Sequence, residues 1–323
     1  YGSVSAVDGQ DHDVLPMIRA KDDQYISNLE RGKFQGITKM HDLILDPGNA
    51  GQLENLHLFL RGWIFPTDAS INVALTQSDI LKLEFPVIQV IDQEGHWQTI
   101  ETNMSFPMGK DKTVIVDLKD KFLSKDRRLR IRTNMEIYWD EIFFGDVKNK
   151  NNLVTNVMQA KTAELHYRGF SKTYRKGGRY GPHWFDYSQV DRNTKWRDLT
   201  GRYTRYGDVE PLLKTSDNQY IISNAGDETS INFDATSLPE LKEGWTRDFL
   251  IHSVGWVKDG DFNTAYGNTV EPLPYHGMAA YPPSGQDIYP LQSELLPYND
   301  VYNTRLVSHK AFQNSIKPIL SEE

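Results

Sequence analysis

Residues 166–206 combine side chains that bind by stacking with side chains that bind by charge. This stretch holds ten Lys or Arg residues and three acidic residues, so it carries a formal charge of +7, whereas the whole chain carries -8. An aromatic face stacks on a sugar ring, and an arginine pairs with a carboxylate or a phosphate through two parallel hydrogen bonds. The ten aromatic residues of the stretch are Tyr167, Phe170, Tyr174, Tyr180, Trp184, Phe185, Tyr187, Trp196, Tyr203 and Tyr206.

A binding surface is expected around the turn-rich sequence GGRYGP at 177–182. Its rings and cations suit an anionic or neutral glycan. They suit a partner protein equally well, since Tyr, Trp and Arg dominate the energetics of interfaces. The competing interpretation is architectural: the arginines stack on the rings and clamp loops onto the fold. A single-stranded RNA ligand would use the same stacking, but the acidic remainder of the chain disfavours it. The predicted binding residues are Arg175, Arg179, Tyr180, His183, Trp184 and Tyr187.

The sequence KDGDFN at 258–263 alternates oxygen-bearing side chains, as the first half of a calcium loop does. An EF-hand loop would need glycine at its sixth position and glutamate at its twelfth, where this chain has Thr264 and Val270. An EF-hand is therefore excluded, and a solvated Asp-Gly turn is the expected structure. Calcium in a different geometry is the alternative, and no other cofactor is expected. Its candidate ligands are Asp259, Asp261 and Asn263.

The sequence contains no recognisable catalytic motif. It lacks the paired-histidine patterns of zinc sites, the Gly-x-Ser-x-Gly turn of hydrolases and the glycine-rich loops that hold phosphates. His183 and Asp186 offer acid–base chemistry on a glycan, but side chains three residues apart on a strand point to opposite faces. These residues therefore favour a non-catalytic module, with a glycan-active enzyme as the alternative.

The composition suits a globular chain of two domains. Its 323 residues exceed one ordinary small domain. The acidic balance argues against a duplex nucleic-acid partner, which selects for a basic surface. No apolar run approaches the roughly 20 residues of a membrane helix, so no transmembrane segment is expected. The chain has no cysteine, which excludes disulfides and fits an oxidising compartment. It begins at Tyr1 without a signal segment, so we expect a mature product or a fragment.

Alternating apolar residues between 40 and 147 predict a series of short β-strands. The clearest are LHLFL at 56–60, a hairpin around Gln93–Gly95, and the aromatic run YWDEIFF at 138–144. Similar alternation occurs at 114–118 and 129–133. Several short strands separated by turns are typical of a β-sandwich or jelly roll. One helical turn is expected near Ser78–Leu81.

The rest of the chain predicts a second β-rich, loop-rich region and a proline-rich tail. We expect strands at Tyr220–Ser223, Ser230–Phe233 and Phe249–Trp256. Seven of the 15 prolines follow residue 271, which predicts an extended tail over the surface, with one short element at Leu306–Phe312. The predicted fold is mainly β: a lead-in segment, a jelly-roll-like β-sandwich, a β-rich aromatic and basic region, and the tail. These divisions span 1–39, 40–147, 148–270 and 271–323.

Four segments together resemble the C-terminal region of bacterial secreted proteins with FG-GAP (VCBS) repeats and an ASPIC/UnbV segment. They are RGWIFPTDASINVAL (61–75), RLRIRTNMEIYWDEI (128–142), LHYRGFSKTYRKGGRYGPHWFDY (165–187) and GWTRDFLIHSVGWVKDGDFNTAYGNTVEPLP (244–274). Separately, YWDEI at 138–142 is similar to the closing strand of galactose-binding-like jelly rolls. The first resemblance covers about residues 1–310 and implies an exported protein, located in the periplasm or outside the cell.

The resemblance implies no catalytic residues, and the acidic calcium loop of the FG-GAP propeller is missing from this chain. We therefore expect a non-catalytic module that docks on a partner protein or polymer, within a larger complex or alone. The alternatives are a glycan-active enzyme and a purely structural subunit of a larger envelope assembly. Fold alone does not decide among them.

Overall fold

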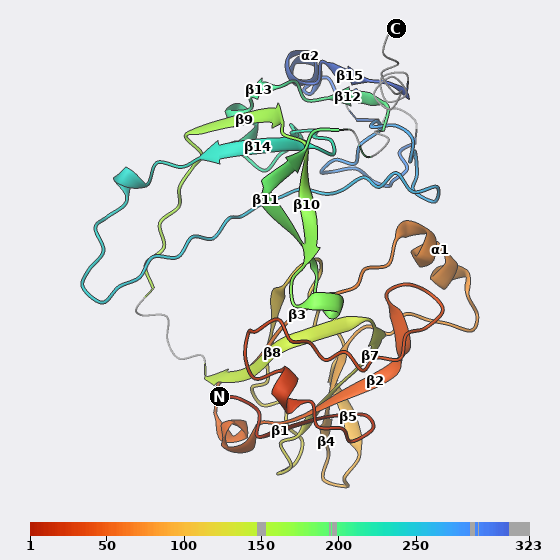
Figure 1. Ribbon diagram of the computed structural model, residues 1–323, viewed down its shortest axis with the longest axis vertical. Helices are drawn as coiled ribbons and strands as arrows, with labels where there is room; N and C mark the ends of the chain where they lie inside the picture. Colours follow the sequence, from red (N-terminus) through yellow and green to blue (C-terminus); the bar gives the residue numbers. More distant parts are fainter. Residues whose placement is uncertain (147–152, 194, 196–198, 285–287, 290, 310–323) are drawn as a thin grey trace, which may run out of the picture. The chain divides into compact units, whose positions relative to one another are not determined.

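The computed structural model describes residues 1–146, 153–193, 195, 199–284, 288, 289 and 291–309. The chain forms two compact units (Figure 1). Unit 1 comprises Tyr1–Leu153 and Thr173–Phe185, and unit 2 comprises Val154–Lys172 and Asp186–Glu323. Trp196 and the end of the element expected at Leu306–Phe312 lie outside the described residues. The fold is mainly β, as predicted.

Unit 1 is a β-sandwich. One antiparallel sheet has the strand order β1-β2-β7-β4-β5 and the other has the order β6-β3-β8. From β2 to β8 the chain crosses repeatedly between the two sheets, as in a jelly roll. The strands are β1 (Ser5–Asp8), β2 (Ile37–Asp46), β3 (Leu56–Ile64), β4 (Val87–Ile91), β5 (Trp97–Glu101), β6 (Lys112–Asp117), β7 (Leu129–Met135) and β8 (Ile137–Asp146).

The alternation in the sequence sets which face of each strand is buried. Leu56, Leu58 and Leu60 of β3 are at most 1% exposed, because alternate side chains of a strand point to the same face. Residues of both sheets share one apolar core. The predicted hairpin is also confirmed: β4 and β5 pair, and the Asp92 N–H donates to the His96 carbonyl at 2.9 Å.

Helix α1 (Ala69–Gln77) lies before the helical turn expected at Ser78–Leu81. Its first turn is fixed by Asp68, whose carboxylate accepts the Ile71 N–H at 2.8 Å, since the first N–H groups of a helix have no partner within it. The prediction of a helical turn at Ser78–Leu81 did not take Asp68 into account as the residue that begins the helix. Within the described residues, no helix combines the length and apolar character needed to cross a membrane.

The first 39 residues are part of the sandwich and not a separate lead-in. Strand β1 pairs with β2, and Ala6 and Ile18 are each 1% exposed in the core. Further along, the Ile26 N–H donates to the Trp139 carbonyl at 3.1 Å, which attaches this segment to β8. The polar composition of the segment hid these few buried apolar residues.

The tip of a hairpin from the aromatic and basic stretch also belongs to unit 1. The hairpin consists of β10 (Phe170–Arg175) and β11 (His183–Asp191), and a 3₁₀ turn at Gly178–Tyr180 forms its tip. The Trp63 indole N–H donates to the Tyr180 carbonyl at 2.9 Å. Lys176 pairs with Asp23 at 3.0 Å. The boundary expected between residues 147 and 148 therefore does not hold for the hairpin tip. Aromatic and ionic contacts attach the tip to the sandwich.

Gly177 is expected to be essential for this docking. It adopts φ +73, and a Cβ there would lie 2.2 Å from the Asp23 carbonyl oxygen. Gly177→Ala should destabilise the docked tip by about 2 kcal/mol or more, through the left-handed conformation and the clash combined. Hydrogen exchange of the tip amides measures this. Gly178→Ala is the matched control, because Gly178 has φ +78 but no atom within 4 Å of the added Cβ. Equal effects of the two variants would contradict the clash.

Unit 2 is a looser assembly of short sheets and loops. Strand β9 (Thr162–Tyr167) lies between β13 (Gly207–Asp208) and β14 (Asp227–Asn232). Strand β12 (Gly201–Tyr203) pairs with β15 (Arg305–Val307), and helix α2 spans Leu296–Tyr302. The core residues are Ala163, Leu165, Tyr203, Val209, Leu212, Val270, Leu273, Tyr289, Leu295 and Tyr298.

The proline-rich tail was expected to lie over the surface, but it also contributes residues to this core. Tyr289 is 0% exposed, and its hydroxyl donates to the Asn218 carbonyl at 3.1 Å. The Tyr298 hydroxyl donates to the Tyr220 carbonyl at 2.5 Å. Large tyrosine rings therefore anchor a segment whose prolines resist regular structure.

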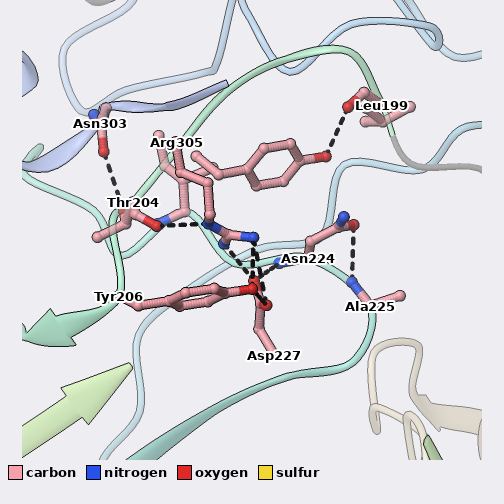
Figure 2. A network of polar contacts seen from close by, with 10 residues as sticks. Leu199, Thr204, Tyr206, Asn224, Ala225, Asp227, Asn303 and Arg305 are labelled. Carbon is pink, nitrogen blue, oxygen red and sulfur yellow. Dashed lines mark hydrogen bonds and ion pairs between the residues drawn. The ribbon is translucent and has the colours of Figure 1, made fainter. Parts of the chain in front are cut away.

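An arginine enclosed by tyrosine rings ties β15 to the start of β14 (Figure 2). The Arg305 guanidinium pairs with Asp227 at 2.5 Å and lies over the rings of Tyr206 and Tyr203, at 4.3 and 5.2 Å from their centroids. The Tyr206 hydroxyl donates to the same carboxylate at 2.8 Å, and the Asn224 N–H does so at 2.7 Å. In unit 2 the arginine–aromatic pattern thus has the architectural role that the sequence left open.

The strand expected at Phe249–Trp256 does not form. Residues 246–261 have no sheet partner in the described structure. Leu250 is 100% exposed and Ile251 is 82% exposed, so the apolar side chains on both sides of this extended segment face solvent. Of the pair expected at 220–223 and 230–233, only the second overlaps a strand, β14.

Candidate functional site

A pocket of about 300 Å³ lies where the hairpin tip meets the sandwich, within unit 1. Its aromatic floor belongs to β3 and β8, the middle strand and an edge strand of the three-stranded sheet. Trp63 and Tyr138 stack there with ring centroids 5.1 Å apart. The tip supplies the opposite side. The lining residues are Arg31, Trp63, Phe65, Tyr138, Arg175, Arg179 and Tyr180.

One of the three arginines is neutralised by a buried acid. Arg31 Nε lies 2.9 Å from Glu136, whose side chain is 4% exposed, and Arg31 also donates to the Tyr138 hydroxyl at 3.0 Å. The Tyr138 hydroxyl donates to Glu136 at 2.5 Å. Burial raises the pKa of Tyr138 to about 12, so this phenol remains a donor at neutral pH. Arg31, Glu136 and the Tyr138 hydroxyl therefore hold one another in place in the pocket lining, and together they contribute no net charge to it.

The other two arginines have no carboxylate partner among the described residues. Arg175 donates to the Gly181 carbonyl at 2.9 Å, which leaves most of its donors unused. Arg179 is exposed, and its guanidinium lies 5.5 Å from the centroid of the neighbouring Tyr180 ring. The pocket therefore carries two uncompensated positive charges, an arrangement that suits an anionic group.

The structure brings together three of the six predicted binding residues. Arg175, Arg179 and Tyr180 line the pocket. His183 is exposed on β11 and lies outside the pocket lining, and so does Trp184. The Trp184 ring instead receives two lysines, Lys110 at 4.9 Å and Lys176 at 5.1 Å.

Tyr187 belongs to unit 2 and not to the pocket. Its ring lies 5.2 Å from the Arg168 guanidinium, which also donates to the Tyr187 carbonyl at 2.6 Å. Asp186, considered for acid–base chemistry, accepts hydrogen bonds from Ser188 and Gln189, and the Ser188 bonds lower the pKa of this carboxyl. Asp186 therefore stays ionised at neutral pH and is unsuited to act as an acid.

Four of the seven residues that line the pocket were missed by reasoning from the sequence. Trp63, Phe65 and Tyr138 look like strand residues of the core, and Arg31 lies in a polar segment with no pattern. A signal existed for β3: the apolar residues Leu56, Leu58 and Leu60 occupy one face, so Trp63 falls on the opposite face. A large apolar ring on the outer face requires a cover, and the hairpin tip provides part of it.

The predicted calcium residues are used in turns of their own backbone. Asp259 accepts the Asp261 N–H at 3.2 Å, and Asp261 accepts the Asn263 N–H at 2.8 Å. These are the Asx turns typical of Asp-Gly sequences. Two other groups of the described residues bring three potential metal ligands together, and neither includes these positions. They are Asp92, Glu94 and His96 on the β4–β5 turn, and Asp23, Asp111 and Asp140.

The second of these groups is largely buried, with Asp140 fully buried and Asp23 partly exposed. Burial raises the pKa of Asp140 to about 6, although the N–H groups of Asp22 and Asp23 both donate to its Oδ1 and oppose the increase. A carboxyl with this pKa is mostly ionised at neutral pH in a site that disfavours charge. The negative charge of Asp140 therefore requires a positive charge close to it.

Comparison with known proteins gives no match for this chain among protein-family models, curated proteins or solved structures.

Proposed function

We propose that this chain is a non-catalytic interaction module that docks on a partner protein, and that the arginine–aromatic pocket receives an acidic side chain of that partner. The observation that carries the proposal is the pair Arg175 and Arg179, two guanidinium groups without a carboxylate partner in the described structure, at the mouth of a preformed pocket. A carboxylate accepts two parallel hydrogen bonds from such a group.

The burial of the pocket floor favours a protein over a glycan. Trp63 is 5% exposed and Tyr138 is 1% exposed, and their rings stack on each other. A sugar ring needs an open aromatic face, which this floor does not offer. The exposed apolar residues of 249–257 in unit 2 also support a protein partner, because large exposed apolar surfaces mark interaction sites.

An exported location is part of the proposal. It is supported by the resemblance of segments 61–75, 128–142, 165–187 and 244–274 to the C-terminal region of secreted FG-GAP proteins. The lack of cysteine is compatible with that location. On this view the module would act in the periplasm or outside the cell, as one subunit of a larger complex.

Removing the two charges is expected to weaken acid-dependent docking. Poly-L-glutamate serves as a probe of defined chemistry, with neutral dextran as the unbound reference. Arg175→Gln combined with Arg179→Gln should weaken binding of poly-L-glutamate by about tenfold or more, because a hydrogen bond to a charged group contributes about 1.5–3 kcal/mol. Binding is measured by fluorescence anisotropy at two salt concentrations.

A second double variant separates the pocket from general charge. Lys119→Gln with Lys125→Gln removes two exposed positive charges elsewhere in unit 1. We expect it to bind poly-L-glutamate nearly as well as the wild type. If both double variants lose affinity equally, or if the wild type does not bind the probe, the docking proposal fails.

A further inference from the structure

We propose that Asp23, Asp111 and Asp140 form a binding site for a calcium ion in unit 1. One carboxylate oxygen of each residue lies within 4.8 Å of the others. The three come from separate segments: Asp23 from the N-terminal segment, Asp111 from the residue before β6, and Asp140 from β8. A calcium ion with oxygen ligands at about 2.3–2.6 Å spans such a separation.

A β-bulge places Asp140 in this group. Arg61 of β3 pairs with Glu141, while the next residue, Gly62, pairs with Trp139, so Asp140 is the extra residue of β8. A bulge redirects a side chain that regular alternation would place elsewhere. Asp140 thereby joins the outer face of the sheet, where Arg61 also lies, and its side chain is 0% exposed.

The buried carboxylates have oxygen atoms without a hydrogen bond, and this observation is independent of their proximity. Asp140 Oδ2 and Asp111 Oδ2 accept no hydrogen bond, and the Asp111 side chain is 2% exposed. Arg61 forms long ion pairs with both, its nitrogens 3.9 Å from Asp140 and 3.7 Å from Asp111, and these distances lie beyond hydrogen-bond range. Arg61 Nε has no hydrogen bond either. Buried polar atoms in native proteins are rarely left in this state.

The charges around the site remain unbalanced. Among the described residues, three carboxylates face two cations, Arg61 and Lys176, and Lys176 pairs with Asp23 at 3.0 Å. One negative charge is therefore in excess in a largely buried group, where uncompensated charge is costly. A divalent cation between the carboxylates would supply ligands for their free oxygens, with Arg61 held outside the ligand shell.

The chemistry of the ligands favours calcium over other divalent ions. All candidate ligands are hard oxygens, and the Tyr25 hydroxyl adds a further oxygen 3.3 Å from Asp111 Oδ1. Magnesium retains several waters and requires near-octahedral geometry at about 2.0–2.1 Å, whereas calcium accepts the irregular arrangement that carboxylates from three separate segments provide. Zinc favours nitrogen and sulfur ligands, and the group contains neither. The site does not depend on the proposed docking function, because none of the three aspartates lines the pocket.

The test is calcium titration of the full chain after treatment with a chelator. Isothermal calorimetry should give one ion per chain, and calcium should raise the melting temperature, since it binds only the folded state. Terbium serves as a luminescent substitute for calcium, and the nearby Tyr25 should sensitise its emission. Asp111→Asn and Asp140→Asn should lose both the heat and the emission.

Two further variants make the result decisive. Asp92→Asn combined with Glu94→Gln alters the other group of potential ligands in unit 1, Asp92, Glu94 and His96, and should leave the titration unchanged. Asp23 lies at the rim of the site, with 22% of its side chain exposed. Asp23→Asn therefore tests the site if a variant at a buried aspartate does not fold. Absence of heat and of a melting shift in the wild type overturns the site, as does binding that survives Asp111→Asn and Asp23→Asn. Binding lost only in the Asp92 variant overturns it too.

Discussion

Asp227→Ala is expected to destabilise unit 2 by about 3–5 kcal/mol, the cost of leaving one member of a buried ion pair without its partner. The Asp227 side chain is 1% exposed and accepts hydrogen bonds from Arg305, Tyr206 and Asn224. The alanine leaves the Arg305 guanidinium between two tyrosine rings with no negative charge beside it. Hydrogen exchange of the amides in β9, β14 and β15 reports unit 2 separately from unit 1.

A control variant separates the effect of losing a buried carboxylate from the effect of losing a negative charge anywhere in unit 2. Asp248 is exposed and has no described hydrogen bond or ion pair, so Asp248→Ala should change stability by less than about 0.5 kcal/mol. Arg305→Met combined with Asp227→Leu should recover part of the loss, because an apolar pair of similar volume often replaces a buried ion pair. A loss below about 1 kcal/mol in Asp227→Ala would show that solvent reaches the network.

Trp63→Ala is expected to destabilise unit 1 by about 3–5 kcal/mol and to release the hairpin tip. The indole is 5% exposed, stacks on Tyr138 and donates to the Tyr180 carbonyl. The alanine removes the ring contact and the hydrogen bond together. Urea denaturation measures the stability, and exchange of the amides at 177–182 measures the release.

Trp63→Phe separates the two contributions. Phenylalanine keeps a ring against Tyr138 but leaves the Tyr180 carbonyl without its donor, which costs about 1 kcal/mol. We therefore expect a mild loss of stability and a selective increase in exchange at the tip. If Trp63→Ala leaves tip exchange unchanged, the tip does not depend on this ring. The floor of the proposed docking pocket would then need another explanation.

The strands of the sandwich were predictable because their pattern is local. Alternation at 56–60 and the turn at Gln93–Gly95 each decide a structure within a few residues. The segment Phe249–Trp256 shows the limit of such reasoning. It has the composition of a strand but pairs with nothing in the described structure, because a strand also needs a neighbour with free backbone groups.

The candidate site was predictable only in part, for the same reason. Charge and aromatic content identified Arg175, Arg179 and Tyr180, which lie close together in the sequence. The residues facing them, Trp63 and Tyr138, are over 30 residues away and lie on strands that looked like ordinary core. The bulge at Asp140 depends on how β3 and β8 align, which neither strand reveals alone.

The division of unit 1 into two stretches of sequence has a consequence for synthesis and dissection. Residues 173–185 emerge from the ribosome only after residues 154–172, which belong to unit 2. Trp63 and Tyr138 are packed by Tyr25, Leu29 and Phe65 of the earlier chain, but they lack the part of their cover that Tyr180 supplies until the tip has been made. A fragment ending near residue 150 would lack this part of the cover permanently, and each unit is made of two separate stretches of sequence, so neither unit can be produced alone as one uninterrupted piece.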